Sequence, residues 1–220
     1  MEDLKIVRLD RRHLGDFERL HSGREFGGCF CALWRSPQEG WVERCKTSPK
    51  DHFADTRSRV QSGEHIGFLA IRESDGAIVG WTGSGPKTAF PLMKERPGSR
   101  LSPFEDSLWA VGCLAIPFVY RDLGYAREMV RLLIEEARRA GAKAVEACPV
   151  EPADESAAWR GSKSLFESLG FKAAGSEPLG ERTVLRMEKV LVEATTAPAA
   201  QESPKEAPQE PQTPTPAQSS

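Results

Sequence analysis

The sequence predicts a mixed α/β fold, and three consecutive patterns carry that prediction. Residues 108–116 are apolar on both faces, as expected for a strand buried inside a sheet. From Tyr125 to Ala137 the apolar residues recur at the helical spacing i, i+3, i+4 and i+7. Residues 143–148 return to a strand pattern, so the three segments form a strand-helix-strand unit with parallel pairing.

Local signals predict the elements before this unit. Residues 4–9 alternate like a strand, and Asp10 is suited to cap the helix that follows. Residues 34–61 look mostly helical and polar. Residues 66–71 and 77–82 predict two antiparallel strands joined by a turn that ends at a glycine.

Two further predictions frame the unit. Residues 86–103 are rich in proline, glycine and charge without periodicity, which predicts a long irregular loop lying over a site. After the unit, a short helix over residues 162–169 ends at Gly170, and residues 182–187 close the sheet.

The composition divides the chain after Val192. Residues 1–192 read as one domain, whereas residues 193–220 are rich in Pro, Ala, Gln and Glu and are expected to be a disordered tail. The net charge is −2, and without the tail's four Glu and one Lys the remainder is close to +1. Because nucleic-acid binding needs a basic surface, no nucleic-acid partner is expected.

The sequence also argues against membrane insertion, metal binding and disulfides. No apolar run is long enough to cross a membrane, and the first residues lack the order of a secretory signal, so no membrane partner and a cytoplasmic location are expected. The five cysteines are odd in number and predict reduced thiols. The Cys29-x-Cys31 pair has no partner pair at a zinc spacing, so no metal site is expected.

The start of the central helix is typical of an anion site. No Ser or Thr precedes it to cap the first-turn N–H groups, and the helix dipole favours negative charge at that end. Gly124 has no Cβ and lets an anion approach the backbone. An isolated glycine before a helix more often only turns the chain. Here the turn lies inside a crossover unit, where α/β proteins hold phosphate groups.

The residues of this turn resemble the GNAT N-acetyltransferase superfamily. Arg121-x-x-Gly124-x-Ala126 matches its R/Q-x-x-G-x-G/A signature. Ile116-x-x-x-Tyr120-Arg121 is similar to the family's strand exit, although Phe118 stands where proline is common. Residues 165–171, Leu-Phe-Glu-Ser-Leu-Gly-Phe, resemble the ending of the family's fourth helix, and the likeness covers about residues 4 to 191.

This resemblance implies a three-layer α/β/α sandwich, with helices flanking a mixed and mostly antiparallel sheet. It also implies acetyl-CoA as cosubstrate. The pyrophosphate would bind backbone amides of Arg121, Asp122, Leu123, Gly124, Tyr125 and Ala126, and the pantetheine arm would run beside Leu114, Ala115 and Ile116 as an extra strand does. A narrower likeness is to GNAT proteins with a Cys-rich segment containing Trp34, interpreted as a packed cluster that shapes the acceptor pocket.

The family's usual proton donor, a tyrosine on the fourth helix, is replaced here by Phe166. Either the thiolate leaves unprotonated, or Ser164, Cys148 or Tyr120 donates the proton, or catalysis has been lost.

Glu146 is the leading candidate for the base, because small apolar neighbours would raise its pKa. Glu105 and Asp106 come next. The alternative is that Glu146 faces solvent or pairs with an arginine.

Two functions are therefore predicted. The first is an acetyl-CoA-dependent N-acetyltransferase that acts on a primary amine of a small molecule or protein. The second is a non-catalytic acyl-CoA-binding module. The amine acceptor is unknown, and a homodimer is left open.

Overall fold

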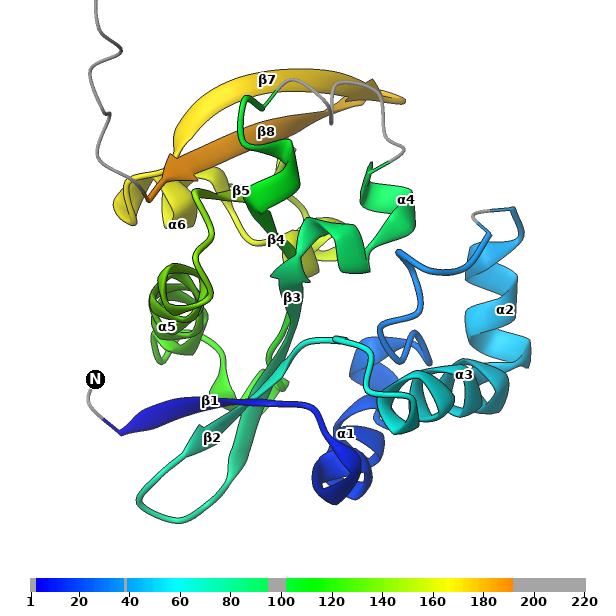
Figure 1. The fold of residues 1–220 in the computed structure, drawn as a ribbon. Helices are drawn as coiled ribbons and strands as arrows, with labels where there is room; N and C mark the ends of the chain where they lie inside the picture. The colour runs from blue at the N-terminus through cyan, green and yellow to red at the C-terminus, as the bar shows by residue number, and fades with distance from the viewer. Residues whose placement is uncertain (1–2, 38, 95–101, 192–220) are drawn as a thin grey trace, which may run out of the picture.

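In the computed structural model, which describes residues 3–37, 39–94 and 102–191, the strands form one eight-stranded sheet (Figure 1). The strands are β1 (Leu4–Arg8), β2 (Phe68–Arg72), β3 (Ile78–Pro86), β4 (Leu108–Ala115), β5 (Ala144–Ala147), β6 (Val150–Glu151), β7 (Lys172–Leu179) and β8 (Arg182–Val190). Their order is β1-β2-β3-β4-β5-β8-β6, and β7 pairs with β8 beside this path.

The sheet is antiparallel at every described pairing except one. β4 and β5 run parallel, with Leu108 opposite Ala144 and Val111 opposite Ala147. This is the pairing that the strand-helix-strand pattern predicts, since the helix returns the chain to the end of the sheet at which β4 begins.

Helices cover both faces of the sheet. They are α1 (Leu14–His21), α2 (Trp41–Thr47), α3 (Pro49–Gln61), α4 (Pro91–Lys94), α5 (Tyr125–Arg139) and α6 (Lys163–Ser168). Helices α5 and α6 lie on one side, and α1, α2 and α3 lie on the other (Figure 1). The predicted fold class, a mixed sheet in a three-layer sandwich, is confirmed.

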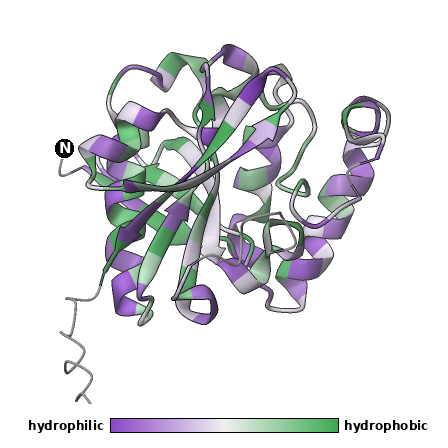
Figure 2. Ribbon diagram, turned by 90° about the horizontal axis from the view of Figure 1, so that it is seen from above, coloured by the Kyte–Doolittle hydropathy of each residue, from purple (hydrophilic) through white to green (hydrophobic). Residues whose placement is uncertain are grey.

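Each helical layer has its own core. The apolar stripe of α5, which includes Met129 and Leu133, packs on one face of the sheet with Phe166 of α6. On the other face, Phe17 of α1 and Val60 of α3 pack against Trp81 of β3. In Figure 2, the helices show apolar residues alternating with polar ones along the ribbon, as amphipathic helices do.

The structure confirms most of the predicted elements and differs in others. The segment predicted to be a loop from residue 86 contains the 3-10 helix η3 (Lys87–Ala89) and α4, and its residues 95–101 lie outside the described residues. Strand β7 was not predicted, because its residues show little apolar alternation and most are exposed.

Within the described residues, no helix is long and apolar enough to cross a membrane. The boundary predicted after Val192 and the tail lie outside the described part of the chain.

Candidate functional site

The central feature of the site is the divergence of β4 from β5. The two strands pair only as far as Val111 and Ala147, yet β4 continues to Ala115. On its other edge β4 stays paired with β3, where Leu114 lies opposite Thr82. The last residues of β4 therefore have one edge without a strand partner, and the 3-10 helix η7 (Glu155–Arg160) lies beside it.

The N-terminus of α5 opens beside this free edge. Gly124 precedes the helix with φ 83°, and no side chain caps the first turn. Asp122 also adopts a left-handed conformation, with φ 60°, which costs a residue other than glycine roughly 1 kcal/mol or more. First-turn amides of a helix have no partner within it, so this end presents N–H donors and a positive dipole.

The strand edge and the helix end line one groove of about 460 Å³. Among the residues predicted to bind the cofactor, those lining the groove are Leu114, Ala115, Ile116, Arg121, Asp122, Gly124, Tyr125 and Ala126. Leu123 is 53% exposed and is not part of the lining. The structure thus brings together two predicted segments that are separated in sequence by residues 117–120.

The side chain of Arg121 contacts the segment that follows β4. Its Nε donates to the carbonyl of Ile116 at 3.1 Å, and its guanidinium carbon lies 5.6 Å from the centroid of the Phe118 ring. Arg127, in the first turn of α5, also lines the groove. Two arginines therefore lie at the end of the groove that is next to the positive, N-terminal end of α5.

The predicted proton donors occupy different surroundings. Tyr120 lines the groove. Ser164 lies on the exposed side of α6, with its Oγ 3.0 Å from Oγ of Ser162, and lines neither the groove nor the cavity described below. The catalytic role of Ser164 stays a prediction.

Phe166 is fully buried and packs on Phe171, with ring centroids 5.2 Å apart. A Cβ on Gly161 would lie 2.9 Å from the Phe166 ring, so only glycine allows the chain to pass this close. Since Gly161 lines the groove, the Phe166 ring lies directly behind the groove wall.

Glu146 is buried in a charged cluster rather than in the groove. Its Oε2 lies 3.2 Å from Nζ of Lys87 and 3.6 Å from Nη1 of Arg186. Lys87, which is 1% exposed, also reaches Glu105 at 3.4 Å. These contacts match the alternative of a buried ion pair, and Glu146 lines neither cavity. Its role as base stays a prediction.

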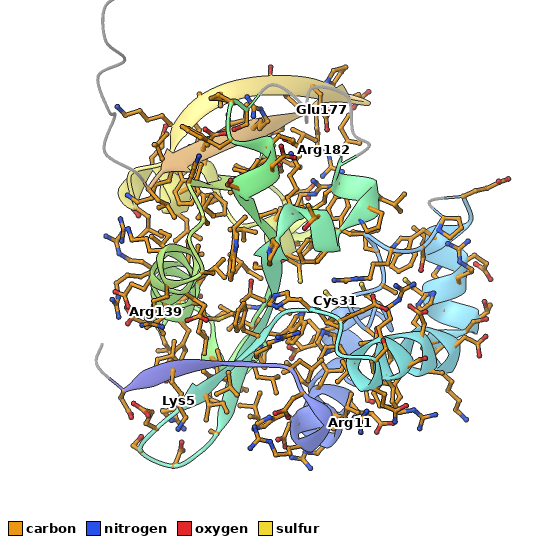
Figure 3. The ribbon with its side chains drawn as sticks, viewed as in Figure 1. Lys5, Arg11, Cys31, Arg139, Glu177 and Arg182 are labelled. Atoms are coloured by element: carbon orange, nitrogen blue, oxygen red, sulfur yellow. The ribbon has the colours of Figure 1, made fainter. Side chains whose placement is uncertain are left out.

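A second cavity of about 870 Å³ adjoins the groove. Its wall includes Cys29, Cys31 and Trp34 of the Cys-rich segment, together with Cys113 of β4. Figure 3 shows Cys31 in the interior, between the sheet and the helices of the N-terminal half. The segment predicted to shape an acceptor pocket therefore lies at a cavity next to the groove.

Cys31 and Cys113 form a thiol pair on the floor of this cavity. A hydrogen bond from Cys113 and the charge of Arg35 lower the pKa of Cys31, although burial opposes them. The same bond and burial raise the pKa of Cys113. The β-bulge at Gly83 accommodates both sulfurs, because a Cβ there would lie 2.3 Å from Sγ of Cys31. All five cysteines are free, as predicted.

Five residues line both cavities: Glu25, Phe26, Ala115, Glu155 and Trp159. Sequence reasoning predicted Ala115 and missed the other four. Those four lie in no recognisable motif, and they come from two segments more than 100 residues apart. No pattern within the chain could have indicated that they meet.

Comparisons with known proteins agree with this geometry. Residues 30–171 match the model of the acetyltransferase (GNAT) family. No curated protein sequence matches the chain. Among solved structures, a GCN5-related N-acetyltransferase from Kribbella flavida aligns with a TM-score of 0.53 and 17% identity over 86% of this chain and 99% of its own.

Two other solved structures are similar. The putative acetyltransferase yncA from Salmonella typhimurium, determined with acetyl-CoA, has a TM-score of 0.53 and 16% identity over 90% of this chain and 99% of its own. The aminoglycoside acetyltransferase AAC(6')-Ib, in complex with coenzyme A, has a TM-score of 0.55 and 11% identity over 85% of this chain and 94% of its own. At such identities these structures show a shared fold.

The family match covers well over half of the chain, includes both strands that diverge, and contains the helix whose first turn faces the groove. The chain therefore belongs to the acetyltransferase (GNAT) family, as the turn from Arg121 to Ala126 predicts.

Proposed function

We propose that this acetyltransferase moves the acetyl group of acetyl-CoA to a primary amine. The observation that carries the proposal is the groove that joins the free edge of β4 to the uncapped N-terminus of α5. A strand edge suits an extended amide-containing arm, and a helix N-terminus suits a pyrophosphate. Acetyl-CoA carries these two groups in that order.

The donor would bind along these two elements. Its pyrophosphate accepts hydrogen bonds from backbone amides between Arg121 and Ala126, and Gly124 leaves room for that approach. The pantetheine arm runs beside Leu114, Ala115 and Ile116. The acetyl-CoA in the yncA structure and the coenzyme A in the AAC(6')-Ib structure support this choice of donor.

The transfer needs no tyrosine at position 166. The amine nitrogen attacks the thioester carbonyl, a C–N bond forms, and the C–S bond breaks with release of the coenzyme A thiolate. A thiol pKa of about 8.5 makes the thiolate a fair leaving group near neutral pH. Of the alternative donors, Tyr120 is the one whose side chain lines the groove, so it is the best placed to protonate the thiolate.

The proton of the amine is most simply accepted by a carboxylate at the junction of the two cavities. Glu25 and Glu155 line both cavities, whereas Glu146 lines neither. A positioned base typically contributes about 10²- to 10⁴-fold to the rate. We therefore favour Glu25 or Glu155 over Glu146 in this role.

The variant Gly124→Glu tests donor binding. A side chain at this position enters the phosphate site and adds a negative charge, so we expect affinity for coenzyme A to fall by at least about tenfold, or about 1.4 kcal/mol. Isothermal titration calorimetry measures the affinity. Gly141→Glu is a matched control, because Gly141 at the other end of α5 also has a positive φ, of 78°, and its Cβ would meet open space. Equal affinities of the two variants would contradict the proposed site.

Turnover separates the enzyme from a binding module. Thiol release would be followed with acetyl-CoA and a panel of primary amines, peptides and aminoglycosides. We expect release with at least one acceptor. Tight binding of coenzyme A with no thiol release across the panel would favour the non-catalytic binding module. That module is the alternative function because position 166 holds a buried phenylalanine, which cannot donate a proton.

Three finer predictions accompany this proposal. A cytoplasmic location, a homodimer and the lack of a nucleic-acid partner remain predictions. Fractionation, analytical ultracentrifugation and a filter-binding assay would test them in turn.

A further inference from the structure

The second cavity has the position of an acceptor site. It meets the groove at Ala115, the residue on β4 beside which the proposed donor would place its thioester. Its volume of about 870 Å³ lies within the range of pockets for small molecules, about 300–1,000 Å³. A molecule held there would lie next to the reacting carbonyl.

The walls of this cavity are mainly aromatic and apolar. Trp34 is held by a hydrogen bond from its Nε1 to the carbonyl of Gly112 at 3.0 Å. Trp41 stacks on His52 with ring centroids 4.8 Å apart. The ring centroid of Trp159 lies 6.3 Å from that of Trp34. Fixed rings of this kind bind flat or apolar groups without losing much side-chain entropy.

The mouth of the cavity also exposes apolar side chains. Val42 of α2 is 67% exposed, and Leu179 of β7 is 42% exposed. Single exposed apolar residues are ordinary, but these two belong to the wall of one large cavity. Burial of this surface would strengthen the binding of a ligand with an apolar body.

Negative charge is concentrated where the cavity meets the groove. Glu25 is held by the amide of Phe118, which donates to its Oε2 at 2.8 Å. Among the described residues, neither Glu25 nor Glu155 forms an ion pair. Arg160 is the cation among the residues lining the cavity, and its guanidinium lies over the ring of Trp159 at 4.5 Å. Burial lowers the pKa of His21 to about 4, so this wall residue is neutral near pH 7.

We propose that the acceptor is a primary amine attached to an aromatic or similarly large apolar body. The inference rests on the proposed acetyl transfer and names its acceptor class. The ammonium lies at Glu25 and Glu155, where one carboxylate takes its proton, and the body lies among the tryptophans. Sugars and polyamines would leave polar groups facing apolar walls, which is costly.

A matched set of acceptors tests the inference on the full chain with acetyl-CoA. Phenethylamine and tryptamine would be compared with 2-methoxyethylamine, putrescine and kanamycin by kcat/KM for thiol release. Because burying a phenyl-sized group is favourable, we expect an advantage of about 30- to 150-fold for the aromatic amines, equivalent to roughly 2–3 kcal/mol. An equal or better result for the polar amines would overturn the inference.

A pair of variants tests the carboxylate. Glu155→Gln keeps the shape of the side chain and removes its charge, and we expect a loss of kcat/KM for phenethylamine of at least about tenfold. Glu181→Gln, on the exposed turn between β7 and β8, is the matched control. Equal values for the two variants would contradict a role for Glu155.

Direct binding separates this inference from the proposed function. Calorimetry of phenethylamine with the protein saturated with coenzyme A needs no turnover. Binding without acetyl transfer would support the acceptor class and contradict the proposed enzyme. Transfer to polar amines without binding of phenethylamine would support the enzyme and overturn the acceptor class.

Discussion

At the scale of single residues, Cys31 combines an unusual backbone conformation with a thiol whose pKa is lowered. Its backbone has φ 57°, in the left-handed region, and its side chain is 4% exposed but lines the acceptor cavity. Arg35 reinforces the site by donating from Nη1 to the Cys31 carbonyl at 3.2 Å. The hydrogen bond from Cys113 and the charge of Arg35 lower the pKa of this thiol, which favours the reactive thiolate.

We therefore expect iodoacetamide to alkylate Cys31 at a lower pH than Cys29. Burial raises the pKa of Cys29 to about 12, so that neighbour should stay unmodified. Peptide mapping by mass spectrometry across pH 5.5–9 measures the labelling, and Cys31→Ala is the control. Labelling of Cys29 ahead of Cys31 would contradict this assignment.

The buried ring of His21 makes stability depend on pH. Its Nδ1 lies 3.1 Å from the carbonyl of Phe17, and burial lowers its pKa from 6.5 to about 4. The unfolded chain therefore binds a proton between these values while the folded chain does not. Stability is full above about pH 6.5 and falls as the pH decreases toward 4, by about 3 kcal/mol from this group.

Urea denaturation of the parent and His21→Phe at several pH values measures this effect. Phenylalanine suits the surrounding rings of Phe17, Phe26 and Phe30 but cannot take up a proton. We expect the free energy of unfolding of the variant to fall less than that of the parent between pH 6.5 and 4. Parallel curves for the two proteins would show that another group is responsible.

At the scale of elements, the charged cluster around Lys87 connects η3 with β5 and β8. Lys87 and Glu146 are 1% and 4% exposed at their side chains, and Arg186 joins them from β8. Removing one member of a buried ion pair leaves the other charge without compensation. We expect Lys87→Met to lower the free energy of unfolding by about 3–5 kcal/mol. Urea denaturation measures the loss, with Lys143→Met as the control, because Lys143 is exposed and lies just before β5.

Glu146→Gln distinguishes the two roles considered for that residue. A structural ion pair predicts lower stability, with a rate of thiol release per folded molecule that changes by less than about tenfold. A general base predicts a loss of about 10²-fold or more in a protein that is still folded. The contacts of Glu146 with Lys87 and Arg186 lead us to expect the first result.

The elements that the sequence predicts well are those with strong local patterns. The apolar stripe of α5 and the apolar run of β4 are visible in the chain, because each element is largely determined by the side chains it buries. η7 and β7 were missed for the opposite reason. Their surroundings, rather than their own periodicity, hold them in place: β7 pairs with β8 along its whole length.

At the scale of the whole molecule, the described sheet is complete without the tail. β8 ends at Val190, and the amide of Leu191 donates to the carbonyl of Lys143 at 2.8 Å. We expect a chain that ends at Val192 to keep its affinity for coenzyme A within about twofold and its melting temperature within a few degrees. Calorimetry and thermal unfolding of both chains would measure this, and a clear loss of affinity would assign the tail a role in binding.

The sequence by itself determined the family, the order of the central elements and the segments that line the groove. These depend on contacts between near neighbours, such as the left-handed turn at Gly124 directly before α5. Only the tertiary structure decided which side chains meet. Glu25 and Glu155 reach one junction because η2 (Arg24–Phe26) and η7 lie close to the open end of β4. Packing between distant segments leaves no local pattern, so the acceptor cavity became visible only in the folded chain.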